Sequence, residues 1–201
     1  MSVPSKKILY AVIVVSLVFC RLLAAEEKIS LAISVPEIAA RSCSTPVWNG
    51  VTAVWEGVKD ERESKEVGTQ EQKKKDPILV MADPPLEGIM NRAVKEIFEA
   101  CGMKLVHRGQ GSDSLPRISA EIMEFYVGVT KKLVTGTSQS IAKLKFNIEK
   151  DGLLSTVTMG TELDSKGLRS KNITQLKKSL NILLSTLIEN IPGTDELKQI
   201  R

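Results

Sequence analysis

The fold is decided near the C-terminus by the stretch from Asn172 to Ile191, which reads NITQLKKSLNILLSTLIENI. Its apolar residues recur every three or four positions, which is the spacing of one face of an α-helix. These residues are Ile173, Leu176, Leu180, Leu183, Leu184, Leu187, Ile188 and Ile191. Asn172 and Gln175 can cap the start of this helix, and Pro192 and Gly193 predict its end. The rest of the chain has to cover so apolar a face.

A second helix is predicted after Asp83-Pro84, with Asp83 as the cap and Pro84 at the first helical position. Its apolar stripe consists of Leu86, Ile89, Met90, Ala93, Ile97, Phe98 and Cys101. Gly102 follows directly and can end the helix in a left-handed conformation. The chain therefore offers two amphipathic helices for one core.

Alternating or short continuous apolar runs predict the strands between these helices. The predicted strands span 28–35, 50–58, 78–82, 103–107, 117–129, 142–148 and 153–163. Asp151-Gly152 predicts a hairpin turn, and a change of apolar face near Glu124 predicts a bulge or burial on both faces. The segments 39–49 and 59–76 are interpreted as loops, the second one solvated because it is dense in charge.

Neighbouring strands with separate helices predict an α+β fold, with an antiparallel or mixed sheet and two helices packed on one face. The opposite sheet face carries Lys and Thr and should meet water or a partner. The predicted organisation is a signal segment at 1–25, an extended arm or loop at 26–49, and a single α+β domain at 50–201.

The N-terminal segment has the charged, apolar, then small-residue order of a secretory signal, ending at Ala24 and Ala25. Its apolar run from Ile8 to Cys20 is shorter than the ~20 residues that span a bilayer. Lipidation of Cys20 and an uncleaved anchor stay open as alternatives, although Phe19 is bulky for a lipidation signal. All three place the folded part outside the cytoplasm, in the periplasm or associated with the outer membrane.

Export also bears on the charge and on the cysteines. Residues 1–25 contain three basic residues and no acidic one, so without them the net charge falls from +4 to +1. A nearly neutral domain offers nucleic acid no electrostatic footprint. Cys43 and Cys101 could form a disulfide in an oxidising compartment. Free thiols are the favoured interpretation, because Cys101 fits a buried helix stripe and Cys43 lies in a predicted loop.

Four segments carry a resemblance to a known family. They are 51–62, which ends in Asp60-Glu61-Arg62, the helix from Leu86 to Gly102, the strand 118–126, and Lys171-Asn172-Ile173 leading into the last helix. In this arrangement the chain resembles the YajG family of bacterial envelope lipoproteins from Gly50 to Ile191. Members usually carry a proper lipidation box, from which Leu17-Val18-Phe19-Cys20 departs. The resemblance implies no reaction and no catalytic residue.

Few residues suggest catalysis. His107 is the only histidine, and the sequence has no zinc-ligand spacing, nucleophile elbow or glycine-rich phosphate loop. Asp60 and Glu61 flank a charged segment, where their pKa values should stay ordinary, and Asp60 is expected to pair with Arg62 or with the nearby sheet edge. We therefore predict that the protein is not an enzyme and binds no cofactor or metal.

Two binding functions remain. The favoured one is a non-enzymatic cell-envelope accessory protein that binds an envelope protein through a sheet edge or the polar sheet face. The alternative is a carrier of a lipid or other apolar ligand between helices and sheet. An aromatic content of 4% weakens this alternative, because ligand pockets favour aromatic walls. Membrane association is left open, and the sequence predicts neither the partner nor the oligomeric state.

Overall fold

A computed structural model describes residues 26–31, 35–43, 45–72, 75–107, 109, 114–130, 137–166 and 173–200. The predicted signal segment, the candidate lipidation residue Cys20 and the candidate cap Asn172 lie outside these residues.

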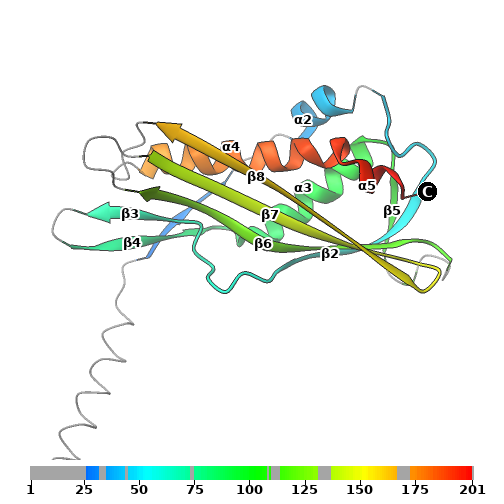
Figure 1. The fold of residues 1–201 in the computed structure, drawn as a ribbon, viewed down its shortest axis with the longest axis horizontal. Coiled ribbons are helices and arrows are strands. Elements are labelled where there is room, and N and C mark those ends of the chain that lie inside the picture. Colours follow the sequence, from blue (N-terminus) through cyan, green and yellow to red (C-terminus); the bar gives the residue numbers. More distant parts are fainter. Residues whose placement is uncertain are drawn as a thin grey trace, which may run out of the picture.

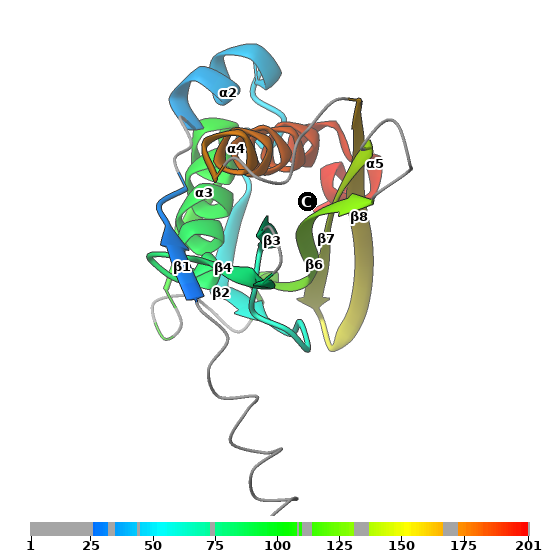
Figure 2. The same cartoon turned by 90° about the vertical axis from the view of Figure 1, so that its left-hand side faces the viewer.

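The frame of the fold is a curved, mixed sheet, which in the described residues has eight strands (Figures 1 and 2). The strands are β1 Glu26–Ile29, β2 Thr52–Asp60, β3 Gly68–Gln72, β4 Lys75–Ala82, β5 Lys104–Val106, β6 Arg117–Thr130, β7 Thr137–Lys150 and β8 Leu153–Lys166. The helices are α2 Val35–Ser42, α3 Leu86–Ala100, α4 Ile173–Asn190 and α5 Asp195–Lys198, with a 3₁₀ turn, η2, at Ile191–Gly193. The predicted α+β class with a mixed sheet is confirmed.

Strand β6 organises the sheet because it contacts three other strands. Along one side it pairs with antiparallel β7 over its whole length. Along the other side, parallel β2 accompanies its first half and parallel β3 meets it only near its end, at Gly68 and Val127. Beyond these, β5 pairs with β2, β4 with β3, and β1 with β4. Strands β2 and β3 thus share one side of β6, with the segment 61–67 between them.

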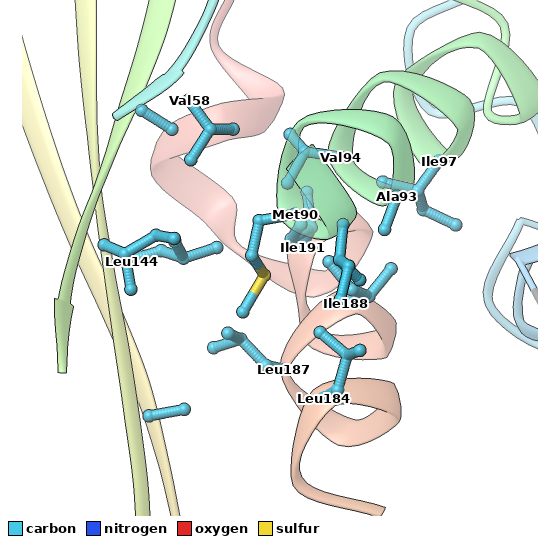
Figure 3. Packing of buried hydrophobic residues seen from close by; sticks show 14 of the residues in the cluster. Val58, Met90, Ala93, Val94, Ile97, Leu144, Leu184, Leu187, Ile188 and Ile191 are labelled. Carbon is cyan, nitrogen blue, oxygen red and sulfur yellow. The ribbon is translucent and has the colours of Figure 1, made fainter. Parts of the chain in front are cut away.

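The two long helices share one core with the sheet (Figure 3). Leu184, Leu187 and Ile188 of α4 lie beside Met90 of α3, and this cluster faces Leu144 of β7. The predicted apolar stripes of the two helices thus form much of the core. Burying each aliphatic side chain of this size stabilises the fold by about 1.5–3 kcal/mol. The expectation of two helices on one face is too simple, however. Helix α2 packs on α3 and α4, a short α5 follows α4, and more residues lie in strands than in helices.

Helix α2 corrects two predictions, because the strand expected over 28–35 ends at Ile29 and the loop or arm expected next contains a helix. Ile38 and Ala39 are buried in the common core. Arg41, in the last turn, donates from Nε to Glu189 Oε1 of α4 at 3.2 Å. A helix of eight residues is marginal alone, so α2 depends on this packing against distant parts of the chain, which local sequence patterns do not reveal.

The segment 59–76 is not the solvated loop that its charge predicts. Strand β2 continues to Asp60, β3 occupies Gly68–Gln72, and β4 begins at Lys75. Val67 is fully buried, and its N–H donates to the Val80 carbonyl oxygen at 2.8 Å. The segment has too few apolar residues to order itself by burial. Main-chain hydrogen bonds to neighbouring strands order it instead.

Turn chemistry was predicted better than helix capping. Asp151 and Gly152 both have positive φ, 52° and 74°, which is the type I′ geometry of a two-residue hairpin. The β6–β7 register shifts between Ile122 and Glu124, so the predicted bulge is confirmed. Helix α3, in contrast, begins only at Leu86, and no side chain caps it. The predicted role of Asp83 as its cap is wrong.

Cys43 and Cys101 form a disulfide, with their Cα atoms 5.2 Å apart. The favoured interpretation of two free thiols is therefore wrong. Helix α2 carries Cys43 to the end of α3, a proximity that no local pattern in the sequence reveals. A bridge across 58 residues of chain is worth about 4 kcal/mol in the chain-entropy picture.

Candidate functional site

Arg62 occupies the point where the chain leaves β2 on its way to β3. Its side chain is only 6% exposed. Arg62 Nε donates to Asp60 Oδ1 and Nη2 donates to Asp60 Oδ2, both at 2.9 Å. Such a two-pronged, charge-assisted contact is among the stronger polar interactions in proteins. The structure therefore joins the two motif residues, as their expected pairing requires.

The remaining guanidinium donors reach main-chain oxygens. Nη1 of Arg62 donates to the carbonyl oxygens of Glu66 and Phe125 at 2.9 Å each, and Nη2 donates to the Lys65 carbonyl oxygen at 3.2 Å. One side chain thus holds the turn 62–66 in shape and also connects it to β6.

The contact with Phe125 closes a gap in the sheet. Before the gap, the Glu61 N–H donates to the Ile122 carbonyl oxygen at 3.1 Å. After it, the Val127 N–H donates to the Val67 carbonyl oxygen at 3.0 Å. Between these bonds, where neither β2 nor β3 accompanies β6, the Arg62 side chain takes the place of a neighbouring strand. The Asp60–Arg62 ion pair could be predicted from the sequence. The use of the Arg62 side chain in place of a neighbouring strand could not.

The electrostatics of the pair also favour a structural role. Partial burial by itself raises the pKa of Asp60, but the hydrogen bonds and charge of Arg62, with the charge of Lys65, outweigh it. The net effect lowers the pKa of Asp60 below its ordinary value. A carboxylate held ionised by an arginine is a poor proton donor or acceptor near neutral pH. We therefore describe Asp60 and Arg62 as a fastener of the sheet.

The outer face of β6 and β7 carries paired charges. Lys145 Nζ and Asn147 Nδ2 donate to the two carboxylate oxygens of Glu121, and Lys143 Nζ donates to Glu124 Oε1, all at 2.9 Å. The hydrogen bond from Lys145 is the main reason why the pKa of Glu121 is lowered. Lysine and glutamate alternate across the strands, so this face is polar without presenting charge of one sign.

The edge of β8 differs from the other edges of the sheet. Among the described residues, β8 pairs only with β7, whereas its 14 residues far exceed the four of β1 and the three of β5. Residues 153–161 contain neither charge nor proline, the usual devices that prevent edges from pairing. Leu153 and Leu154, at the start of this edge, are 74% and 68% exposed. The described structure thus has one long open edge, which is uncharged from Leu153 to Thr161.

His107, the only histidine in the sequence, follows β5 and is exposed. It lies at a shallow surface depression with Glu56, Lys59, Ser119 and Glu121. Within the described ranges no group of three His, Cys, Asp or Glu residues could hold a metal ion. No helix in the same ranges is long and apolar enough to cross a membrane.

Fold and site together define a small α+β module with an arginine-fastened mixed sheet and one open edge. The chain belongs to a family described as uncharacterized lipoproteins, Lipoprotein_16, whose profile matches residues 49–200. This match confirms the resemblance to YajG-like lipoproteins. Membership implies an exported, envelope-associated protein. No curated protein matches the chain.

Several solved structures share features of the fold at low identity. An uncharacterized protein is similar with a TM-score of 0.48 and 9% identity, over 84% of this chain and 97% of that one. A putative neuraminyllactose-binding hemagglutinin homolog from Helicobacter pylori has a TM-score of 0.41 and 11% identity, over 75% and 86%. Lipoprotein GNA1162 from Neisseria meningitidis has a TM-score of 0.36 and 9% identity, over 72% and 99%. No functional property follows from likenesses this distant.

Proposed function

We propose that the protein is a non-enzymatic accessory component of the cell envelope, periplasmic or associated with the outer membrane. It acts by binding another protein through the open edge of β8. The observation that carries this proposal is the long unpaired edge of β8, which is uncharged from Leu153 to Thr161 and begins with two exposed leucines. Unpaired N–H and C=O groups of an edge strand are a template onto which an extended segment can add.

The polar clusters support a binding role over a catalytic one. Asp60 and Arg62 bind each other and the main chain, and Glu121 and Glu124 bind lysines of β7. In each cluster the side chains serve the sheet itself. A general acid or base instead needs a pKa near the working pH and room for a substrate beside it.

The alternative function, a carrier of an apolar ligand, finds less support. Met90, Leu144 and Leu187, which lie between the helices and the sheet, are fully buried by one another and by their neighbours (Figure 3). The depression at His107 lies on the outside of the sheet, beside Glu56 and Lys59. A carrier needs a cavity of several hundred Å³ where these side chains pack.

A photo-crosslinking amino acid at Thr158 in the full chain, expressed in its native cell, tests the proposal. Thr158 is exposed on the β8 edge, and Gln175, exposed on α4, is the matched control position. We expect light-dependent adducts with protein from position 158 and few from position 175. Equal yields from both positions, or none from 158, would overturn binding through this edge.

The carrier alternative has its own readout. Organic extraction of the purified chain followed by mass spectrometry should release no stoichiometric lipid, because a covalently attached N-terminal lipid would stay on the protein. Release of one lipid per chain would favour the carrier instead.

A further inference from the structure

We infer that the open edge of β8 pairs with the same edge of a second copy of this chain, antiparallel and about a two-fold axis at Val157. This inference rests on the proposed function, because it names the partner of the same edge. Pairing with a second copy would account for both the long unpaired edge and the two exposed leucines, Leu153 and Leu154.

The hairpin fixes which main-chain groups face outward. Asp151 and Gly152 form a two-residue turn, so Lys150 and Leu153 are the first hydrogen-bonded pair of the β7–β8 ladder. Hydrogen-bonded and non-hydrogen-bonded pairs alternate along an antiparallel ladder. The odd-numbered residues 153–161 therefore bond to β7. The even-numbered residues from Leu154 to Glu162 direct their N–H and C=O groups to the open side.

These outward groups are suitable for pairing with a second copy. Two-fold symmetry requires the same strand to match itself in the opposite direction. With the axis at Val157, Leu154 faces Gly160 of the second copy and Thr156 faces its Thr158. The four even-numbered residues 154–160 of each copy would then form about eight main-chain hydrogen bonds across the interface.

Charge disfavours the registers in which the axis moves toward the C-terminus. Moving the axis to Thr158 places Leu154 opposite the charged Glu162 of the second copy and takes it away from Gly160. Moving it one residue further places Leu154 opposite Asp164. With the axis at Val157, no two charges of one sign oppose each other, and two Thr–Thr pairs form at the centre.

Gly160 makes room for the leucine. An ideal Cβ at Gly160 would lie 3.0 Å from Cγ of Lys143 and 3.1 Å from the Ala142 carbonyl oxygen, so the lysine stem occupies the place of a side chain. Leu154 of the second copy can lie on this apolar stem, because the Lys143 ammonium is held away by Glu124. Leu153 takes the matching position on the other face, opposite Thr161. Pairing thus covers both leucines.

The interface is small, so the affinity in dilute solution should be low. Attachment of the copies to one membrane would raise their effective concentration and favour the pair. The arrangement continues the sheet of one copy directly into the sheet of the other.

Engineered cysteines in the full chain test the register. At Val157, a non-hydrogen-bonded position, the axis brings two Cα atoms within about 4.5 Å, which suits a disulfide. We expect a covalent dimer from Val157→Cys in oxidised cells and little from Thr158→Cys. Because Val157 is buried, a second pair keeps the test decisive: differently tagged chains with Thr156→Cys and Thr158→Cys should link to each other more than to themselves. The absence of both links overturns the inference.

A charge on the edge tests the contact itself. Thr158→Lys in the Val157→Cys background should lower the yield of covalent dimer at least tenfold, whereas Gln175→Lys should leave it unchanged. An unchanged yield with Thr158→Lys also overturns the inference. If the photo-crosslinker at Thr158 captures only a different protein, self-pairing fails while the proposed function stands. If it captures nothing, both fail.

Discussion

The long strands β6, β7 and β8 form a ladder with two outer edges. The unpaired main-chain groups at these two edges differ in whether another part of the chain satisfies them. On the β6 side, the gap between β2 and β3 leaves the Phe125 carbonyl oxygen without a strand partner, and the buried Arg62 supplies the hydrogen bond. On the β8 side, a whole row of main-chain groups has no partner in the described part of the chain. The hydrogen bond from Arg62 to Phe125 fills the gap beside β6 and should stabilise the folded sheet. The open edge, uncharged from Leu153 to Thr161, is the basis of the proposed binding role.

The largest effect should follow from removing the internal filler. Arg62→Ala leaves the Asp60 carboxylate and three main-chain oxygens without their donor in a site almost closed to water. We expect the free energy of unfolding to fall by about 3–5 kcal/mol, measured by urea denaturation. Arg62→Lys keeps the charge but not the fork, and it should recover only part of the loss. A loss below about 1 kcal/mol for Arg62→Ala would contradict the role of fastener.

The disulfide should come next. The double variant Cys43→Ser with Cys101→Ser should lose about 2–4 kcal/mol of unfolding free energy, because the unfolded chain regains freedom. Reduction of the wild-type protein with dithiothreitol is the matched treatment. It should lower the melting temperature of the wild type and leave that of the double variant unchanged. Equal sensitivity of both proteins would show that the bridge adds no stability.

Lowering the pH should reduce the stability of the sheet by protonating Asp60 beside Arg62. Because the folded-state pKa of Asp60 is lowered, the unfolded chain takes up the proton first. This part of the stability is complete above the unfolded pKa of about 4 and disappears as pH falls toward the folded value. Asp60→Asn should therefore be less stable than wild type at neutral pH, with the difference shrinking below about pH 4. A difference that stays constant down to pH 2 would exclude titration of Asp60 as the cause.

The smallest effect on stability belongs to the open side. Leu153→Ser with Leu154→Ser removes two exposed side chains, so the unfolding free energy should change by less than about 0.5 kcal/mol. The same double variant should abolish most crosslinking at Thr158. Val157→Ser, whose side chain is buried on the same strand, is the contrasting variant and should destabilise measurably. A stable leucine variant that crosslinks normally would separate the leucines from binding.

Features that depend on neighbouring residues could be predicted from the sequence, whereas features that depend on distant parts of the chain could not. The stripe of α4, from Leu176 to Ile188, and the turn at Asp151-Gly152 were predicted because helix periodicity and turn conformation are local properties. Helix α2 and the disulfide depend on surfaces supplied by α3 and α4. The partner of Arg62 was within reach of the sequence, since Asp60 is two residues away. Its contact with Phe125 could not be predicted, because only the folded sheet brings β2 and β3 to the same side of β6 and leaves a gap between them.

The position of the Cys43–Cys101 bridge has a practical consequence for anyone who shortens the chain to the segment that the family profile matches. A fragment that starts at residue 49 lacks Cys43 and also loses α2 and the indole N–H that Trp48 donates to the Leu197 carbonyl oxygen at 2.9 Å. Cys101 would then be an unmatched sulfhydryl at a newly uncovered apolar surface. Two such fragments could link through it and imitate an assembly that the intact chain does not form in this way, so binding studies should retain the residues before 49.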